Sequence, residues 1–128
     1  MTKSLVSVVD DDESVRESLP DLLKELGFAV QAFASAEEFL ASNYISATRC
    51  LLLDVAMPGM SGPELQQELT RLGHAIAIIF ISAGADEKLR RQLVARGAID
   101  CLLKPFSEQA LKAALAAALG ENQEKERI

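Results

Sequence analysis

Short runs of aliphatic residues alternate along the chain with stretches whose apolar residues recur at the spacing of an α-helix. The aliphatic runs predict five strands, at residues 5–9, 28–33, 50–53, 75–81 and 99–103. The other stretches predict five helices, at residues 13–26, 35–42, 61–72, 86–96 and 107–119. The strand runs are continuously apolar, which is typical of parallel strands covered on both faces. The pattern therefore predicts an α/β fold, a doubly wound five-stranded parallel sheet with five helices.

Residues at the ends of the predicted helices support these boundaries. Asp12 precedes the first helix, where a side chain can cap free backbone N–H groups, and Gly27 follows it, where glycine is common. Residues 35–38 and 61–64 each place serine three positions before glutamate, which is the spacing of a capping box. Pro20 lies inside the first helix and should kink it or remove one hydrogen bond.

Composition narrows the class of protein. The chain has 128 residues, of which 49% are hydrophobic and 25% charged, and its net charge is -6. This length suits one domain, at residues 1–120, with a polar tail or the start of a linker at residues 121–128. No signal peptide or membrane span is evident, and two cysteines without a secretory signal predict reduced thiols in the cytoplasm. The acidic charge argues against direct binding of nucleic acid.

Polar side chains follow four of the five predicted strands, at the point where each strand ends. They are Asp10, Asp11, Asp54, Ser82 and Lys104. Because the carboxyl ends of parallel strands meet at one edge of a sheet, we expect these side chains to lie together. Any one of them could instead be a helix cap, a strand-end hydroxyl or a solvated charge. Their matching positions, taken together, favour a functional site.

The residue types at this edge predict a particular chemistry. Three carboxylates in one place repel one another, which raises some of their pKa values. A lysine and a divalent cation together would balance their charge. Oxygen ligands without histidine or cysteine favour Mg²⁺ over zinc, and Mg²⁺ commonly binds one or two carboxylates and a phosphate. Since an aspartate can be the nucleophile that forms an acyl phosphate, the residues predict Mg²⁺-assisted handling of a phosphoryl group.

Four motifs end the predicted strands in a specific order. They are Val9-Asp10-Asp11-Asp12, Asp54 with Met57-Pro58-Gly59-Met60-Ser61-Gly62, Ser82-Ala83, and Lys104-Pro105-Phe106. Across residues 4–119 the chain resembles a CheY-like receiver domain of bacterial two-component response regulators, and most of all the NarL/FixJ type. The resemblance implies a flavodoxin-like sheet of strand order 2-1-3-4-5. It also implies a signalling module, not a turnover enzyme, that receives a phosphoryl group from a sensor histidine kinase.

The resemblance implies a role for each residue of the site. Asp54 would be the phosphoacceptor. Asp11, Asp54 and the backbone carbonyl of Ala56 would hold Mg²⁺ directly, and Asp10 would hold it mainly through water. Lys104 would pair with a phosphoryl oxygen. The function expected from these roles is positioning and charge neutralisation during phosphoryl transfer.

A second group of residues would respond to the phosphoryl group. Ser82 would bond a phosphoryl oxygen, and in the family it works as a switch with an aromatic residue that is Cys101 here. A thiol is too small to fill the space in the same way, so we expect phosphorylation to move residues 83–93 more than Cys101. The family also implies a cis peptide bond at Lys104–Pro105. Pro58–Gly59 fits a type II turn with glycine at positive φ.

The resemblance also indicates where partners would bind. The fourth predicted helix is basic within an acidic chain, with Lys88, Arg90, Arg91 and Arg96. In the family, the face formed by helix four, strand five and helix five meets a second receiver or an output domain. A solvated helix face is the alternative for these residues. An output domain would lie beyond residue 128.

Two other functions stay open at this point. A haloacid-dehalogenase-type phosphatase also uses a strand-end aspartate and Mg²⁺, but it carries a second aspartate two residues later, where this chain has Ala56. A receiver-like module that works without phosphate would have a decayed site. The presence of the full set argues against decay, namely Asp10, Asp11, Asp54, Ser82 and Lys104.

Overall fold

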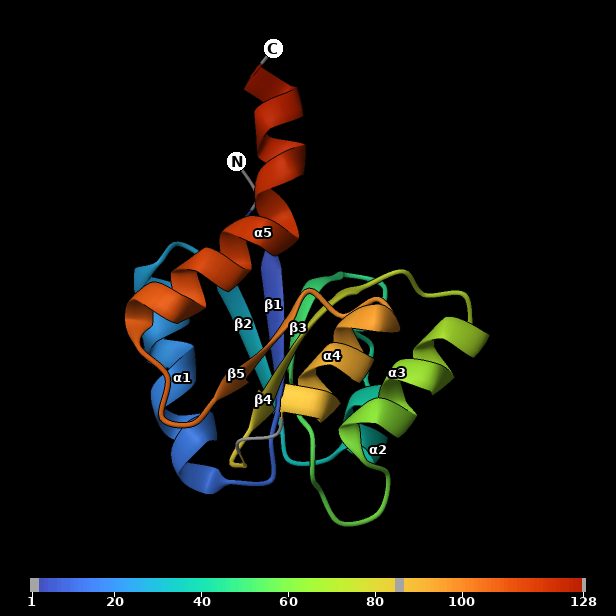
Figure 1. Ribbon diagram of the computed structural model, residues 1–128. Helices are drawn as coiled ribbons and strands as arrows, with labels where there is room; N and C mark the ends of the chain where they lie inside the picture. Colours follow the sequence, from blue (N-terminus) through green and yellow to red (C-terminus); the bar gives the residue numbers. More distant parts are fainter. Residues whose placement is uncertain (1–2, 85–86, 128) are drawn as a thin grey trace.

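The structure, a computed structural model, describes residues 3–84 and 87–127. At its centre lies a five-stranded parallel sheet in the order β2-β1-β3-β4-β5 (Figure 1). The strands are β1 (Leu5–Val9), β2 (Ala29–Phe33), β3 (Thr48–Asp54), β4 (Ala77–Ser82) and β5 (Asp100–Leu103). The helices are α1 (Glu13–Glu25), α2 (Ala36–Leu40), α3 (Gly62–Arg71), α4 (Glu87–Ala95) and α5 (Glu108–Arg127). The predicted fold class and strand order are confirmed.

Helices cover both faces of the sheet, with α1 and α5 on one face and α2, α3 and α4 on the other (Figure 1). Successive strand residues point to opposite faces, so Val8 packs on the α1–α5 side and Val9 on the other. The two cysteines follow the same rule, because Cys50 and Cys101 are buried on opposite faces and neither forms a disulfide. Burial on both faces explains why the strand sequences are continuously apolar.

Strand boundaries differ from the prediction by one or two residues. The strand predicted at 50–53 is longer in the structure, since β3 begins at Thr48. Thr48 is buried, and its hydroxyl shares a 2.7 Å hydrogen bond with the hydroxyl of Ser7 on β1. This pairing between distant residues compensates for burying a polar side chain. Strands β2, β4 and β5 begin slightly later than predicted.

Helix boundaries also differ from the prediction, most clearly at the ends of α2 and α5. Helix α2 ends before the predicted Ser42, whose hydroxyl donates a 2.7 Å hydrogen bond to the carbonyl of Phe39 and so occupies a helix-end carbonyl. Helix α5 continues to Arg127, where a polar tail was predicted, because that segment is rich in glutamate, lysine and glutamine, which favour helix. The predicted start of α4 at Asp86 lies outside the described residues.

The ends of α1 confirm two local predictions. Asp12 is the N-cap, and its carboxylate accepts a 2.9 Å hydrogen bond from the backbone N–H of Ser14. Gly27 follows the C-cap with φ of +102°, a conformation that side chains disfavour. Pro20 lies within α1, and the helix continues past it, so the proline removes a hydrogen-bond donor without ending the helix.

The two predicted capping boxes have different outcomes. At α3, Ser61 accepts from the N–H of Glu64 and Glu64 accepts from the N–H of Ser61, so the box is complete. At α2, Ser35 accepts from the N–H of Glu38, but Glu38 accepts from the N–H of Ala34 instead. The second box is therefore only half formed, although Ser35 caps the helix that its spacing predicted.

Candidate functional site

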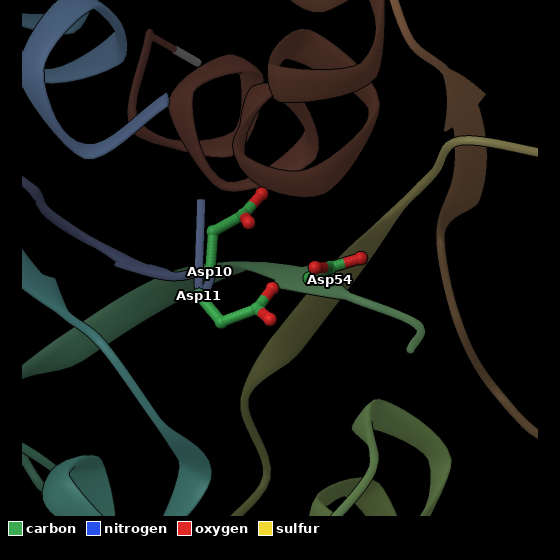
Figure 2. Close-up of side chains that lie close together, drawn as sticks. All are labelled: Asp10, Asp11 and Asp54. Carbon is green, nitrogen blue, oxygen red and sulfur yellow. The ribbon is translucent and has the colours of Figure 1, made fainter. Parts of the chain in front are cut away.

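Three carboxylates converge at the carboxyl edge of the sheet, between β1 and β3. Asp10 directly follows β1, Asp54 is the last residue of β3, and these two strands are neighbours. Oxygens of Asp10, Asp11 and Asp54, hereafter the acidic cluster, lie within 4.8 Å of one another (Figure 2). The sheet order reverses at β1 and β3, which is where doubly wound sheets bind ligands. The structure therefore brings together the three aspartates that the sequence singled out.

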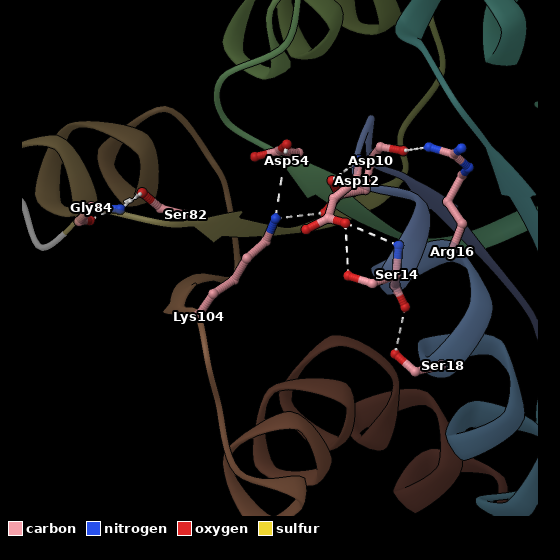
Figure 3. Close-up of polar contacts among 9 residues, drawn as sticks. All are labelled: Asp10, Asp12, Ser14, Arg16, Ser18, Asp54, Ser82, Gly84 and Lys104. Atoms are coloured by element: carbon pink, nitrogen blue, oxygen red, sulfur yellow. Dashed lines mark hydrogen bonds and ion pairs between the residues drawn. The ribbon is translucent and has the colours of Figure 1, made fainter.

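Lys104 enters the same site from the end of β5. Its ammonium lies 2.9 Å from Oδ2 of Asp10 and 4.0 Å from Oδ2 of Asp54 (Figure 3). The side chain of Asp10 is fully buried, and its other oxygen accepts a 2.9 Å hydrogen bond from the backbone N–H of Asp12. A buried carboxylate needs such partners to remain charged. The ammonium of Lys104 thus offsets part of the negative charge of the acidic cluster.

The pKa of Asp54 is raised to about 7, because burial disfavours its charged form and the negative charge of Asp10 adds to this effect. A hydrogen bond with Asp11 acts in the same direction, and Lys104 opposes it. Burial lowers the pKa of Lys104, but its contact with Asp10 and the charge of Asp54 outweigh burial and raise it. Lys104 therefore stays charged at neutral pH. The charge of Lys104 alone does not keep Asp54 fully ionised at that pH.

The composition of the acidic cluster fits a Mg²⁺ ion. Every candidate side-chain ligand is a carboxylate oxygen, and oxygen ligands are the ones that Mg²⁺ prefers. Oδ2 of Asp10 has no solvent contact and meets Lys104 as an ion pair without hydrogen-bond geometry. The raised pKa of Asp54 is a second sign of unbalanced negative charge. Asp11 is exposed, so its carboxylate is a candidate ligand that an ion can reach from solvent.

Comparison with known proteins decides the family. A sequence model of the response regulator receiver domain matches residues 6–116. The chain belongs to this family. Nodulation protein W of Bradyrhizobium diazoefficiens is 46% identical over 117 residues, which are 91% of this chain and 52% of that protein. Receiver domains of this family accept a phosphoryl group from histidine kinases and are signalling modules.

Solved structures agree with this assignment. A structure of the response regulator StyR is 45% identical with a TM-score of 0.86, and the match covers 98% of this chain and 64% of that chain. A crystal structure of FixJ-N is 38% identical with a TM-score of 0.80, covering 92% of this chain and 94% of that one. The resemblance to FixJ-type receivers is thus confirmed. The receiver spans about half the length of the curated relatives it matches.

Ser82 of this receiver lies at the end of β4, as predicted, but bonds to its own loop. Its hydroxyl donates to the carbonyl of Gly84 at 3.0 Å and accepts from the N–H of Gly84 at 3.2 Å (Figure 3). A cavity of about 200 Å³ adjoins it, between β4, α4 and β5. Its lining includes Ser82, Cys101 and Leu103. The cavity beside Ser82 is therefore bordered by the thiol of Cys101, at the position that the sequence indicated.

The loop that follows Asp54, between β3 and α3, depends on glycine. Gly59 has φ of +74°, as predicted for the third position of a type II turn. Gly62 begins α3 so close to β3 that a Cβ atom would overlap the carbonyl oxygen of Asp54. The Lys104–Pro105 bond is cis, as expected from the family. In the described part of the chain, no helix is both long and apolar enough to span a bilayer.

Arg16 is a residue of the site that the sequence did not reveal. Its guanidinium donates a 2.8 Å hydrogen bond to the backbone carbonyl of Asp10 (Figure 3). It thereby holds the turn that presents Asp10 and Asp11. One feature of the sequence could have indicated its role. Arg16 is a basic residue near the start of α1, where the helix dipole favours acidic residues.

Proposed function

We propose that this receiver takes a phosphoryl group onto Asp54 from a phosphohistidine of a sensor kinase. Mg²⁺ would be held by Asp11, by Asp54 and by the backbone carbonyl of Ala56, and through water by Asp10. The observation that carries the proposal is the convergence of three carboxylates within 4.8 Å around the ammonium of Lys104. Neither a solvated surface nor a set of helix caps explains such a concentration of like charge.

The reaction needs little covalent chemistry from the protein. An oxygen of Asp54 attacks the phosphorus atom, the P–N bond breaks, and the imidazole leaves with the electron pair of that bond. Bound Mg²⁺ supplies positive charge to the phosphoryl oxygens. Lys104 is charged and within reach of Asp54, so it can pair with another of these oxygens. Ser82 would exchange its bond to Gly84 for a bond to the phosphoryl group.

The proposal has a direct chemical test. Wild-type protein is incubated with Mg²⁺ and acetyl phosphate, and its intact mass is measured. We expect one adduct of about 80 Da, the mass of a phosphoryl group. The adduct should be lost in Asp54→Asn and kept in Asp21→Asn, a matched change at an exposed position of α1. Chelation of Mg²⁺ should prevent it.

Other outcomes of this test would support other functions. Continuous release of phosphate from phosphate esters, which we do not expect from a signalling module, would indicate an Mg²⁺-dependent phosphatase. The absence of an adduct with any donor would indicate an interaction module that works without phosphate. An adduct retained in Asp54→Asn would move the acceptor to another residue and refute the assignment of Asp54.

We propose that the loop and helix after Ser82 carry the response to phosphorylation. The support is the double hydrogen bond between Ser82 and Gly84, which must break when Ser82 turns toward a phosphoryl group. Backbone amide shifts should then change more within residues 83–93 than at Cys101; residues 85–86 of that segment lie outside the described ones. Shift changes confined to the surroundings of Asp54 would contradict this.

We propose that partners, namely a second copy or an output domain, meet the face of α4, β5 and α5. Val94 and Leu103 leave apolar surface there, with exposed fractions of 41% and 47%. Arg90 is not free for a partner, because it is bonded to Asp100 at 3.0 Å. Leu103→Asp should abolish phosphate-dependent dimerisation in sedimentation experiments. Leu72→Asp, at a similarly exposed position after α3, is the matched control and should not.

The proposed place of action is the cytoplasm. Cys50 and Cys101 are free thiols, as in proteins from reducing compartments. Their burial on opposite faces of the sheet prevents them from pairing with each other. Direct nucleic-acid binding is not part of the proposal, because the net charge of -6 opposes it.

A further inference from the structure

The loop between β3 and α3 (residues 55–61) is firmly closed at its base. The N–H of Val55 donates to the carbonyl of Ile81 at 2.9 Å, and the N–H of Gly62 donates to the carbonyl of Val55 at 3.0 Å. Met57 is buried in the core beside α2 and α3. Between these anchors lies Ala56, whose carbonyl is the proposed backbone ligand of Mg²⁺. The position of that carbonyl therefore depends on how this loop is held.

The tip of the loop is held by a side chain from a different element. Oε2 of Glu37, on α2, accepts a 3.0 Å hydrogen bond from the backbone N–H of Met60. The carboxylate passes so close to Gly59 that a Cβ atom there would lie 2.7 Å from Oε2. The positive φ of Gly59 and its missing side chain thus make room for this contact.

This contact stands out among the hydrogen bonds of the loop. Within the described residues, Glu37 is the one side chain from another element that bonds to residues 55–61. A bond from N–H to a carboxylate is stronger than one between neutral groups. Although Glu37 is exposed, its carboxylate therefore serves to fix a particular backbone atom.

We propose that Glu37 is a positioning residue of the phosphoryl site. By accepting the hydrogen bond from the N–H of Met60, it fixes the loop of residues 55–61, which carries the Ala56 carbonyl proposed as a Mg²⁺ ligand. Outer hydrogen-bond partners of metal ligands act in this way, and their loss weakens metal binding. The inference rests on the proposed function, because it assumes that Mg²⁺ binds at the acidic cluster.

The neighbouring residue provides a matched control. Glu38 lies in the same turn of α2 and has the same charge, but its carboxylate accepts from the N–H of Ala34 and does not contact the loop. Removing Glu38 therefore changes the charge near the site as much as removing Glu37 does. Glu37→Gln adds a second comparison, since its amide oxygen can still accept the bond from Met60 without the charge.

The experiment compares wild type, Glu37→Ala, Glu37→Gln and Glu38→Ala. Hydrogen exchange of the Met60 amide is first measured in protein freed of metal with EDTA. The Mg²⁺ dissociation constant is then obtained from amide shifts, and the rate of phosphorylation by acetyl phosphate from intact mass. Thermal unfolding shows that each variant is folded at the temperature used.

We expect Glu37→Ala to lose protection of the Met60 amide and to bind Mg²⁺ about tenfold more weakly, the low end for outer partners of metal ligands. Glu37→Gln should recover most of both properties, and Glu38→Ala should keep both. If wild type binds Mg²⁺ and is phosphorylated while Glu37→Ala behaves like Glu38→Ala, this inference fails and the proposed function stands. If wild type does not bind Mg²⁺, both fail.

Discussion

Replacing Asp54 by asparagine should stabilise the metal-free receiver. Asp54 is 6% exposed, stands beside the buried Asp10, and has a pKa raised to about 7 from an ordinary 3.8. Above pH 7 the native state must therefore carry an ionised group that its surroundings disfavour. Asparagine has nearly the same shape and carries no charge. The substitution removes this cost and keeps the packing around β3.

The raised pKa of Asp54 sets an upper limit on the stability that Asp54→Asn can gain. A difference of three pH units, at about 1.4 kcal/mol each, corresponds to about 4 kcal/mol. Solvent and mobile ions reach the open side of the site at Asp11 and screen the repulsion. Loss of the 4.0 Å contact between Asp54 and Lys104 opposes the gain further. We therefore expect Asp54→Asn to raise the free energy of unfolding by about 1–2 kcal/mol at pH 8.

The effect should depend on pH with a definite sign. Between the ordinary pKa of 3.8 and the native value of about 7, the native state binds more protons than the unfolded chain. The stability contributed by protonated Asp54 is thus complete below pH 3.8 and is lost as the pH rises to 7. Asp54→Asn removes this dependence, so its advantage should be small at pH 4.5 and largest above pH 7.

Urea unfolding followed by circular dichroism measures this difference. Wild type, Asp54→Asn and the exposed control Asp21→Asn are compared in EDTA at pH 4.5 and pH 8. Added Mg²⁺ should then stabilise wild type more than Asp54→Asn, because it binds the native site and offsets the same repulsion. An equal advantage at both pH values, or a less stable Asp54→Asn at pH 8, would refute the assignment of repulsion at Asp54.

Two further substitutions test the supports of the site. Lys104→Ala leaves the fully buried Asp10 without its counter-ion, so urea unfolding in EDTA at pH 8 should show a loss of about 3 kcal/mol; unchanged stability would refute a stabilising role for the ion pair between Lys104 and Asp10. Gly59→Ala should cost about 1–2 kcal/mol and expose the Met60 amide to exchange, because a side chain there is strained and displaces Glu37. Gly73→Ala has a similar positive φ in open space and should cost only the strain.

The fold and the acidic cluster were predictable because they depend on regular patterns. Apolar runs located the strands, and parallel strands that alternate with helices bring their carboxyl ends to one edge. Asp54 ends β3, and Asp10 and Lys104 directly follow β1 and β5, so their proximity follows from the topology. The strand order itself came from resemblance, since hydrophobic periodicity does not specify which strands are neighbours.

Other features depend on contacts that no local pattern encodes. Glu37 and Arg16 bind backbone groups of distant turns, and in the sequence they resemble ordinary charged residues of helix surfaces. Thr48 pairs with Leu5 of β1, and its hydroxyl bonds to the hydroxyl of Ser7, which is distant in the sequence. The half-formed capping box at Ser35 arises because Glu38 finds another backbone donor within reach. Such choices among competing partners require three-dimensional positions.

The close approach of Gly62 to Asp54 has a mechanical consequence. Closely packed atoms repel steeply when pushed together, so the first turn of α3 and the last peptide of β3 cannot move toward each other. A hydrogen bond from Gly62 to Val55 limits their separation in the opposite direction. The start of α3 and the end of β3 are therefore fixed relative to each other. A displacement of the first turn of α3 must then also displace the carbonyl of Asp54.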